Sequence, residues 1–255
     1  MGSSFNKLEQ GTLVVVGGGR IPFAVCESYV GLAGGHLKAN IVVIPSAASN
    51  ADDPIQHETF LSIWRDFAPR SLRLLHTSSH DHANNWVFVG PLREATGVWF
   101  GGGDPKLLAS IYRGTLVHSE LHQLLARGGV IGGTSAGATV MSDRMIEHGT
   151  DTWAQDGPGF GFLTGVIIDQ HFAVRNRIGR LRNLLRCHPD YAGIGIDEGT
   201  AAIIDISKES LTVSGESTIT ALHAQSSAYP GHEQTLRSGA TLNLNHLKKH
   251  SPIQK

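Results

Sequence analysis

One serine of the chain stands in a pattern that is typical of an activated nucleophile. Residues 133–137 read Gly-Thr-Ser-Ala-Gly, a G-x-S-x-G pattern centred on Ser135. The apolar run before it predicts the end of a strand, and residues 138–141 predict the start of a helix. A sharp turn between the two exposes a serine hydroxyl, and small neighbours make the strained backbone tolerable. We therefore expect a nucleophile at Ser135, with a plain helix cap as the alternative.

A serine nucleophile also needs hydrogen-bond donors for the oxyanion that forms on the attacked carbonyl group. The amide of Ala136 starts the predicted helix, where backbone N–H groups have no partner within the helix. A second amide is expected from the glycine run 101–103, in particular from Gly102 or Gly103. These residues make up the predicted oxyanion hole.

The base and the group that orients it are selected by their setting, because the chain has 14 histidines. His171 follows the predicted strand 166–168, and Glu198 follows the predicted strand 193–196. Side chains that follow parallel strands gather at the carboxyl edge of an open α/β sheet, where such folds place their active sites. We expect His171 to act as the base toward Ser135 and Glu198 to orient the imidazole ring.

Arginines are concentrated just after this histidine. They stand at Arg175, Arg177, Arg180, Arg182 and Arg186. Helical spacing places Arg175 with Arg182, and Arg177 with Arg180, on shared faces. A guanidinium near the nucleophile would bind a substrate carboxylate through two hydrogen bonds. A solvated basic helix face is the alternative, and function is favoured for the arginines nearest His171.

The glycine-rich run at 16–22 follows a predicted strand, as a phosphate-binding loop would. Pro22 occupies the place of the third small residue of a dinucleotide fingerprint, and the next strand ends without an acidic residue. We interpret the run as a tight turn and predict no cofactor. The pair His80 and His82 has no further ligands that the pattern identifies, so no metal is predicted.

Apolar runs with helical segments between them describe the elements that must position these residues. The sequence predicts strands at 13–16, 41–44, 86–89, 97–100 and 129–131, and helices at 56–67, 106–111 and 119–126. Shorter strands at 201–206, 210–213 and 217–221 indicate antiparallel hairpins, and a polar tail begins at His246. We expect one α/β domain over 1–255, with a mostly parallel central sheet flanked by helices. Its core spans about 12–206, and extra C-terminal strands and a tail occupy 207–255.

Composition excludes several classes of protein. The 21 Lys and Arg residues balance 22 Asp and Glu, and a formal charge of −1 argues against a dedicated nucleic-acid binder. No apolar run approaches the roughly 18 residues of a membrane span, and the first ten residues lack a signal-peptide profile. Cys26 and Cys187 are too few for a disulfide scaffold and are expected to be small buried residues, with a single disulfide as the alternative. We expect a cytoplasmic protein without nucleic-acid or membrane partners.

Taken together, these residues resemble the cyanophycinase-like serine peptidases of peptidase family S51, which are related to aspartyl dipeptidase (peptidase E). Five segments carry the resemblance: Pro-Ser-Ala-Ala-Ser at 45–49, Phe-Gly-Gly-Gly-Asp at 100–104, Gly-Gly-Thr-Ser-Ala-Gly-Ala at 132–138, Asp-Gln-His-Phe-x-x-Arg-x-Arg-x-x-Arg at 169–180 and Gly-Ile-Gly-Ile-Asp-Glu-x-Thr-Ala at 193–201. The resemblance implies a fold similar to class I glutamine amidotransferases, which is flavodoxin-like. It also implies Ser135 as nucleophile, His171 as base and Glu198 as the orienting acid. Positions that match the family's substrate pocket are Asp104, Asp169, Gln170, Arg175, Arg177 and Arg180.

The resemblance further implies a homodimer and the release of β-Asp-Arg dipeptides from cyanophycin, a poly-aspartate that bears arginines. The family has Gln where this chain has Pro105, and a proline offers neither a side-chain nor a backbone donor. One substrate contact is therefore expected to be lost. An α-aspartyl dipeptidase or another isopeptidase, and a catalytically silent peptide-binding relative, are the alternatives. A glutamine amidotransferase subunit would be expected to have cysteine at position 135.

Overall fold

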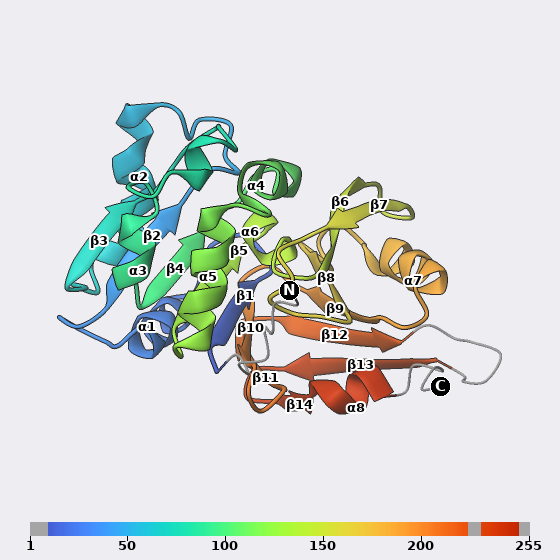
Figure 1. Ribbon diagram of the computed structural model, residues 1–255. Coiled ribbons are helices and arrows are strands. Elements are labelled where there is room, and N and C mark those ends of the chain that lie inside the picture. Colours follow the sequence, from blue (N-terminus) through green and yellow to red (C-terminus); the bar gives the residue numbers. More distant parts are fainter. Residues whose placement is uncertain (1–9, 224–230, 250–255) are drawn as a thin grey trace, which may run out of the picture.

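A large mixed sheet forms the centre of the molecule. The computed structural model describes residues 10–223 and 231–249. Eight strands are ordered β14-β11-β10-β1-β5-β4-β2-β3 in the sheet (Figure 1). Five of them run parallel: β1 (Thr12–Val16), β2 (Asn40–Ile44), β3 (Ser71–Leu74), β4 (Gly97–Phe100) and β5 (Val130–Thr134). The predicted mostly parallel central sheet is confirmed.

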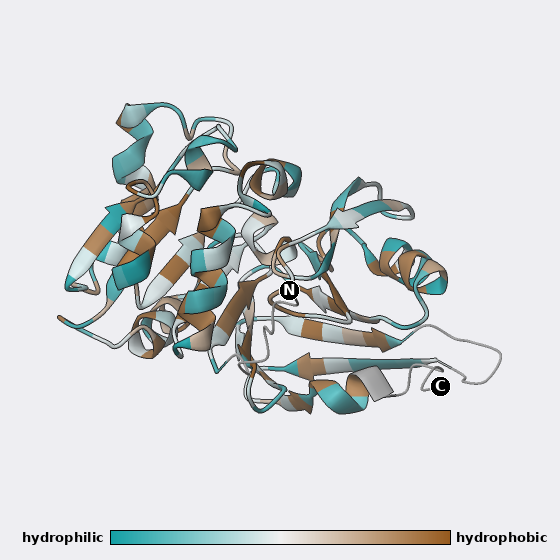
Figure 2. Ribbon diagram, in the orientation of Figure 1, coloured by the Kyte–Doolittle hydropathy of each residue, from teal (hydrophilic) through white to brown (hydrophobic). Residues whose placement is uncertain are grey.

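Helices cover both faces of the parallel strands. Their bounds are α1 (Phe23–Leu32), α2 (Pro54–Arg65), α3 (Gly90–Glu94), α4 (Pro105–Tyr112), α5 (Leu116–Ala126) and α6 (Ala136–Thr139), with a short 3-10 helix η1 (His82–Asn84). Leu13 and Val15 of β1 belong to the core cluster that includes residues of α3, α4 and α5, whereas Val14 and Val16 belong to the cluster that includes residues of α1 and α2. Burial on both faces explains why these strands read as continuous apolar runs. In Figure 2 the apolar colouring follows the central strands, and the outer parts of α2 and of α7 (Ile178–Cys187) are largely hydrophilic.

The C-terminal part of the chain adds antiparallel strands to the central sheet and builds a second one. β10 (Thr200–Asp205), β11 (Ser210–Gly215) and β14 (Thr241–Asn243) extend the central sheet beyond β1. The second sheet is ordered β13-β12-β9-β8, from β8 (Val166–Gln170), β9 (Ala192–Ile196), β12 (Thr218–His223) and β13 (His232–Arg237). The remaining elements are the hairpin of β6 (Arg144–Gly149) and β7 (Ala154–Pro158), α7 (Ile178–Cys187) and α8 (Leu244–Lys249). Ile168 of β8 and Leu13 of β1 belong to the same core cluster, so the two sheets pack together.

Two sequence expectations about local structure are wrong. Residues 86–89 form a turn rather than a strand, because the Asn85 side chain accepts hydrogen bonds from the amides of Val87 and Phe88 at 2.8 and 3.1 Å. Trp86 and Val87 are consequently exposed. Cys26 is buried as expected, but Cys187 ends α7 and is exposed, and both thiols are free. The polar tail predicted from His246 contributes to α8, and residues 250–255 lie outside the described part of the chain.

Among the described residues, no helix combines the length and the apolar character that crossing a bilayer requires.

Candidate active site

Ser135 occupies a strained turn between β5 and α6. Its φ of +54° and ψ of −109° lie outside the conformations that non-glycine residues ordinarily adopt. The amide of Ser135 donates to Val16 O of β1 at 3.1 Å, which ties the turn to the neighbouring strand. A Cβ atom on Gly133 would lie 2.6 Å from Gly137 O, and one on Gly137 would lie 2.5 Å from Phe100 O. The turn therefore needs glycine on both sides of the serine, as the sequence pattern predicts.

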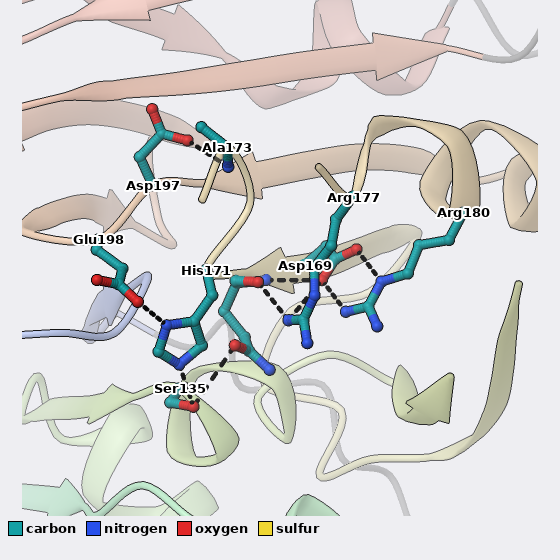
Figure 3. Close-up of polar contacts among 9 residues, drawn as sticks. Ser135, Asp169, His171, Ala173, Arg177, Arg180, Asp197 and Glu198 are labelled. Carbon is teal, nitrogen blue, oxygen red and sulfur yellow. Dashed lines mark hydrogen bonds and ion pairs between the residues drawn. The ribbon is translucent and has the colours of Figure 1, made fainter. Parts of the chain in front are cut away.

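His171 and Glu198 reach this serine from the second sheet. The Oγ atom of Ser135 lies 2.9 Å from Nε2 of His171, and Nδ1 of His171 bonds to Oε1 of Glu198 (Figure 3). Because a carboxylate only accepts, Nδ1 carries the ring proton and Nε2 is left to accept the serine proton. Gln170 and Ile196 are paired in the parallel ladder of β8 and β9, so His171, directly after β8, and Glu198, two residues after β9, leave the second sheet at the same edge. The structure brings together the three side chains of the expected constellation.

Burial lowers the pKa of His171 below its ordinary value of 6.5. The hydrogen bond and charge of Glu198 act in the opposite direction, while the positive charges of Arg175 and Arg177 depress the pKa further. The imidazole is therefore neutral at pH 7, which is the form that can take a proton from a hydroxyl group.

The glycine run after β1 makes room for these two side chains. The amide of His171 donates to Gly17 O at 2.6 Å. A Cβ atom on Gly18 would lie 2.3 Å from Cε1 of His171, and one on Gly19 would lie 3.0 Å from Oε2 of Glu198. The run is a turn, as the sequence indicates, but its role beside His171 was not foreseen. Three consecutive glycines at the carboxyl end of a buried strand are the signal that a close approach occurs there.

A second acidic residue fastens the segment that carries the histidine. Asp197 is buried, and its Oδ1 accepts from the amide of Ala173 at 3.0 Å (Figure 3). Its Oδ2 accepts from the hydroxyls of Ser217 and Thr218 at 2.8 and 2.7 Å, and from the amide of Thr218 at 3.2 Å. Asp197 thus joins the turn after His171 to the start of β12. Sequence reasoning singled out its neighbour Glu198 and missed this residue.

The predicted oxyanion hole borders the nucleophile. A Cβ atom on Gly102 would lie 3.5 Å from Cβ of Ser135, so the glycine backbone passes directly beside the serine. Ala136 begins α6. Gly103 has a φ of +139° and packs instead on Ala47, whose oxygen would lie 1.9 Å from an added Cβ atom. Gly102 and Ala136 are therefore the residues that the fold places beside Ser135.

The residues assigned to the substrate pocket lie in different settings, and only Gln170 has a side chain within 3.5 Å of the Ser135 hydroxyl. Gln170 Oε1 lies 3.5 Å from Ser135 Oγ, and Arg175 is exposed in the turn that precedes α7. Asp169 and Arg180 instead form a buried ion pair through two hydrogen bonds, one of 2.7 Å from Nε to Oδ2. Asp104 is exposed, and its side chain accepts from the amide of Lys106 at 2.8 Å as the N-cap of α4.

Arg177 joins the buried pair. Its Nη1 lies 3.5 Å from Asp169 Oδ1 and also donates to Gln170 O (Figure 3). Burial is the main reason that the pKa of Arg177 falls to about 10. One carboxylate therefore faces two guanidinium groups, and the positive charge of Arg177 is felt at His171. The expected meeting of Arg177 with Arg180 is confirmed.

The expected partnership of Arg175 with Arg182 is wrong, because α7 begins only at Ile178 and Arg175 is not part of the helix. Arg182 pairs with Glu233 of β13 instead. Within the residues that the structure describes, no group of three or more His, Cys, Asp or Glu side chains is arranged to hold a metal ion.

Comparison with solved structures supports the fold. The crystal structure of a peptidase from an acI-B1 Actinobacterium superimposes with a TM-score of 0.73 and 25% sequence identity, covering 94% of this chain and 99% of that one. A structure from Listeria monocytogenes gives a TM-score of 0.54 at 15% identity, over 81% of this chain and 99% of that one, and supports the fold alone.

Sequence comparison identifies the family. A cyanophycinase of Synechococcus elongatus is 33% identical over 202 residues, which is 76% of this chain and 62% of that protein. A cyanophycinase of Geminocystis herdmanii is 31% identical over 223 residues, covering 85% of this chain and 80% of the relative. The chain thus spans about three fifths of the first relative's length. The model of "Peptidase family S51" matches residues 13–212, and the chain therefore belongs to peptidase family S51.

Proposed function

We propose that this protein is a serine peptidase that hydrolyses aspartyl peptide bonds, with Ser135 as nucleophile, His171 as base and Glu198 as the residue that orients the base. The hydrogen-bonded chain from the Ser135 hydroxyl through the imidazole to the carboxylate carries the proposal. The strained backbone of Ser135 supports it, because strain of this kind is retained where function requires an exposed side chain.

Acylation begins when Nε2 of His171 takes the proton of the Ser135 hydroxyl and Oγ attacks the carbonyl carbon of the scissile bond. The negative charge that develops on the carbonyl oxygen is stabilised by the amides of Gly102 and Ala136. Glu198 stabilises the imidazolium that exists at this stage. His171 then gives the proton to the leaving nitrogen, the C–N bond breaks, and an acyl-enzyme remains on Ser135.

Deacylation repeats these steps with water as the nucleophile. His171 removes a proton from water as the oxygen attacks the ester carbonyl, and then returns a proton to Oγ of Ser135. The acid product leaves and the resting hydrogen bond between Ser135 and His171 is restored.

We further propose cyanophycin as the substrate, with β-Asp-Arg dipeptides as the product. The names of the relatives from Synechococcus elongatus and Geminocystis herdmanii support this assignment. The excess positive charge also supports it, because Arg177 and Arg180 share a single carboxylate of the protein, Asp169, and the exposed Arg175 adds a further positive charge near Arg177. A substrate carboxylate would balance that charge through guanidinium hydrogen bonds.

An α-aspartyl dipeptidase is the second candidate, and Pro105 is the observation that favours it. Pro105 is buried at the first position of α4, and its ring starts the helix where the cyanophycinase pattern has a Gln. The substrate contact of that side chain is absent from Pro105, so recognition of the β-linked arginine depends on the remaining pocket residues.

Mass analysis of products from cyanophycin, β-Asp-Arg peptides and α-aspartyl dipeptides separates the candidates. We expect β-Asp-Arg dipeptides from the first two substrates and no product from the Ser135→Ala variant. Cleavage of α-linked peptides alone would replace cyanophycin by the second candidate.

An alkyl fluorophosphonate tests the chemistry without a substrate. The bond between Ser135 Oγ and phosphorus forms, the P–F bond breaks, fluoride leaves and His171 takes the hydroxyl proton. The wild-type protein is expected to be labelled at Ser135 and the Ser135→Ala variant to stay unlabelled. A folded wild-type protein that neither reacts nor cleaves any of the peptides would be a silent peptide-binding relative.

A further inference from the structure

A second hydrogen-bonded chain of serine, histidine and aspartate lies outside the proposed active site. Oγ of Ser46 lies 2.8 Å from Nδ1 of His76, whose Nε2 lies 2.9 Å from Oδ1 of Asp52. The same Oγ lies 2.6 Å from the hydroxyl of Tyr112. Ser46 and Tyr112 are buried, the His76 side chain is 11% exposed and that of Asp52 is 78% exposed. We call these four residues the Ser46 network.

The direction of each hydrogen bond follows from the groups involved. The Asp52 carboxylate only accepts, so Nε2 of His76 carries the proton and Nδ1 accepts from the Ser46 hydroxyl. Ser46 in turn accepts from Tyr112, because burial raises the pKa of that phenol to about 12 and keeps it protonated. Both functions of the Ser46 hydroxyl are thus engaged, and at 2% exposure it is out of reach of a substrate. The network is suited to holding backbone in place rather than to attacking a bond.

The backbone that it holds contacts both ends of α4. Tyr112 is the last residue of this helix, and a helical side chain leans toward the N-terminus, which brings its hydroxyl to Ser46. At the other end, the amide of Asp104 donates to Ala47 O at 2.9 Å. Two consecutive residues in the loop after β2, Ser46 and Ala47, therefore fix the helix relative to the central sheet.

The segment that enters α4 is the glycine run of the predicted oxyanion hole. The amide of Gly101 donates to Ile44 O at 3.0 Å, and Gly103 packs directly on the Ala47 oxygen. Gly102 lies between them and beside Ser135. A displacement of Ala47 would therefore move Gly103 and, with it, the neighbouring Gly102, whose amide the proposed function assigns to the oxyanion hole.

We propose that His76 is a positioning residue, which acts through Ser46 and Ala47 to hold the Gly102 amide in place for the oxyanion. The inference rests on the proposed function, because the position of this amide matters to the reaction only if Ser135 attacks. His76 itself touches neither the substrate nor the reacting atoms.

The rate of fluorophosphonate labelling is the first test, since the reagent's oxygen occupies the oxyanion position in the adduct. A misplacement of about 1 Å in a preorganised site lowers rates by up to 10²-fold, so we expect His76→Ala to react about tenfold more slowly. The kcat for an aspartyl peptide should fall by the same factor, with KM changed less than twofold, because the oxyanion exists only beyond the ground state. His76→Asn keeps an acceptor for Ser46 and should retain most of the rate. His36→Ala, at an exposed residue, is the matched control and should match the wild type.

Amide hydrogen exchange at Asp104 is the second test and does not depend on activity. Exchange should be faster in His76→Ala than in the wild type, because the hydrogen bond to Ala47 is loosened. Asp52→Ala changes an exposed side chain, so it tests the network even if His76→Ala fails to fold, and a two- to threefold loss of labelling rate is expected. Wild-type labelling and exchange in these variants would overturn the inference, as would a rise in KM with kcat unchanged. If instead Ser135→Ala remains active while exchange at Asp104 still responds to His76, the proposed function fails and the mechanical link stands.

Discussion

The imidazole of His171 and the hydroxyl of Ser135 meet across the junction of two sheets. Ser135 follows β5 of the eight-stranded sheet and His171 follows β8 of the four-stranded sheet, yet Nε2 and Oγ are 2.9 Å apart. The segment that spans the junction is the glycine run after β1, since Gly17 O accepts from the amide of His171. The geometry of the proposed nucleophile and base therefore depends on a third segment that takes no part in the chemistry.

Gly18→Ala tests this dependence. The added methyl group would lie 2.3 Å from the imidazole, so we expect the ring to be displaced and kcat to fall by about 10²-fold. Steady-state kinetics with the aspartyl peptide that the wild type cleaves is the measurement.

Gly35→Ala is the matched control for this substitution. Gly35 also has a positive φ, +82°, but no atom would lie within 4 Å of an added Cβ. It should lose about 1 kcal/mol of unfolding free energy and keep its kcat. Equal kcat values in the two alanine variants would show that Gly18 has no special relation to His171.

The acid limb of the kcat/KM profile is expected below pH 6.5. Activity requires the neutral imidazole, so it is lost as the pH falls through the pKa of His171, which burial lowers. Arg175→Ala removes a positive charge that depresses this pKa and should move the limb to higher pH. Glu198→Gln removes interactions that raise the pKa and should move the limb to lower pH, besides reducing the rate.

Arg186 supplies the control for the pH profile. It is an exposed arginine near the end of α7 that bonds to Asn183 and does not contribute to the pKa of His171. Arg186→Ala should leave the acid limb in place. Shifts of the same sign in Arg175→Ala and Glu198→Gln would contradict the assignment of the limb to His171.

Asp197→Asn should lower kcat although the residue touches no reacting atom. Asparagine has one acceptor oxygen, so either the amide of Ala173 or that of Thr218 loses its partner, whereas the hydroxyls can reorient. An unsatisfied buried N–H group costs about 1–3 kcal/mol, and relaxation of the turn would move His171. Asp205→Asn, which alters a similar cluster at the end of β10, should leave kcat unchanged. Unaltered kcat in Asp197→Asn would show that the turn is held by other contacts.

The sequence predicts the strands and the three reacting groups because both depend on local signals. The runs at β1, β2 and β4 are apolar on two faces, and Ser135, His171 and Glu198 each follow such a run. β3 was missed because this edge strand is only partly buried. The strand predicted at 86–89 does not form, because the side chain of a single residue, Asn85, holds the backbone in a turn there.

What the sequence does not reveal is which strand ends become neighbours. Gly18 is 153 positions from His171, and the pattern around it reads only as a turn until the order of β1, β9 and β10 is known. The same holds for Asp197, whose partners Ala173 and Thr218 lie on separate segments. Ser46 and His76 were likewise not identified, because nothing in their local sequence indicates a shared hydrogen bond.

The buried ion pair of Asp169 and Arg180 should be important for stability as well as for the site. Asp169→Ala leaves Arg177 and Arg180 without their buried carboxylate, and breaking such a pair costs about 3–5 kcal/mol of unfolding free energy. Urea denaturation followed by tryptophan fluorescence is the measurement. Glu233→Ala breaks the exposed pair with Arg182 and should cost at most about 1 kcal/mol, because water already screens these charges. If the two variants are equally stable, the carboxylate of Asp169 is not what keeps the arginines in place, and a substrate carboxylate would have to organise them on binding.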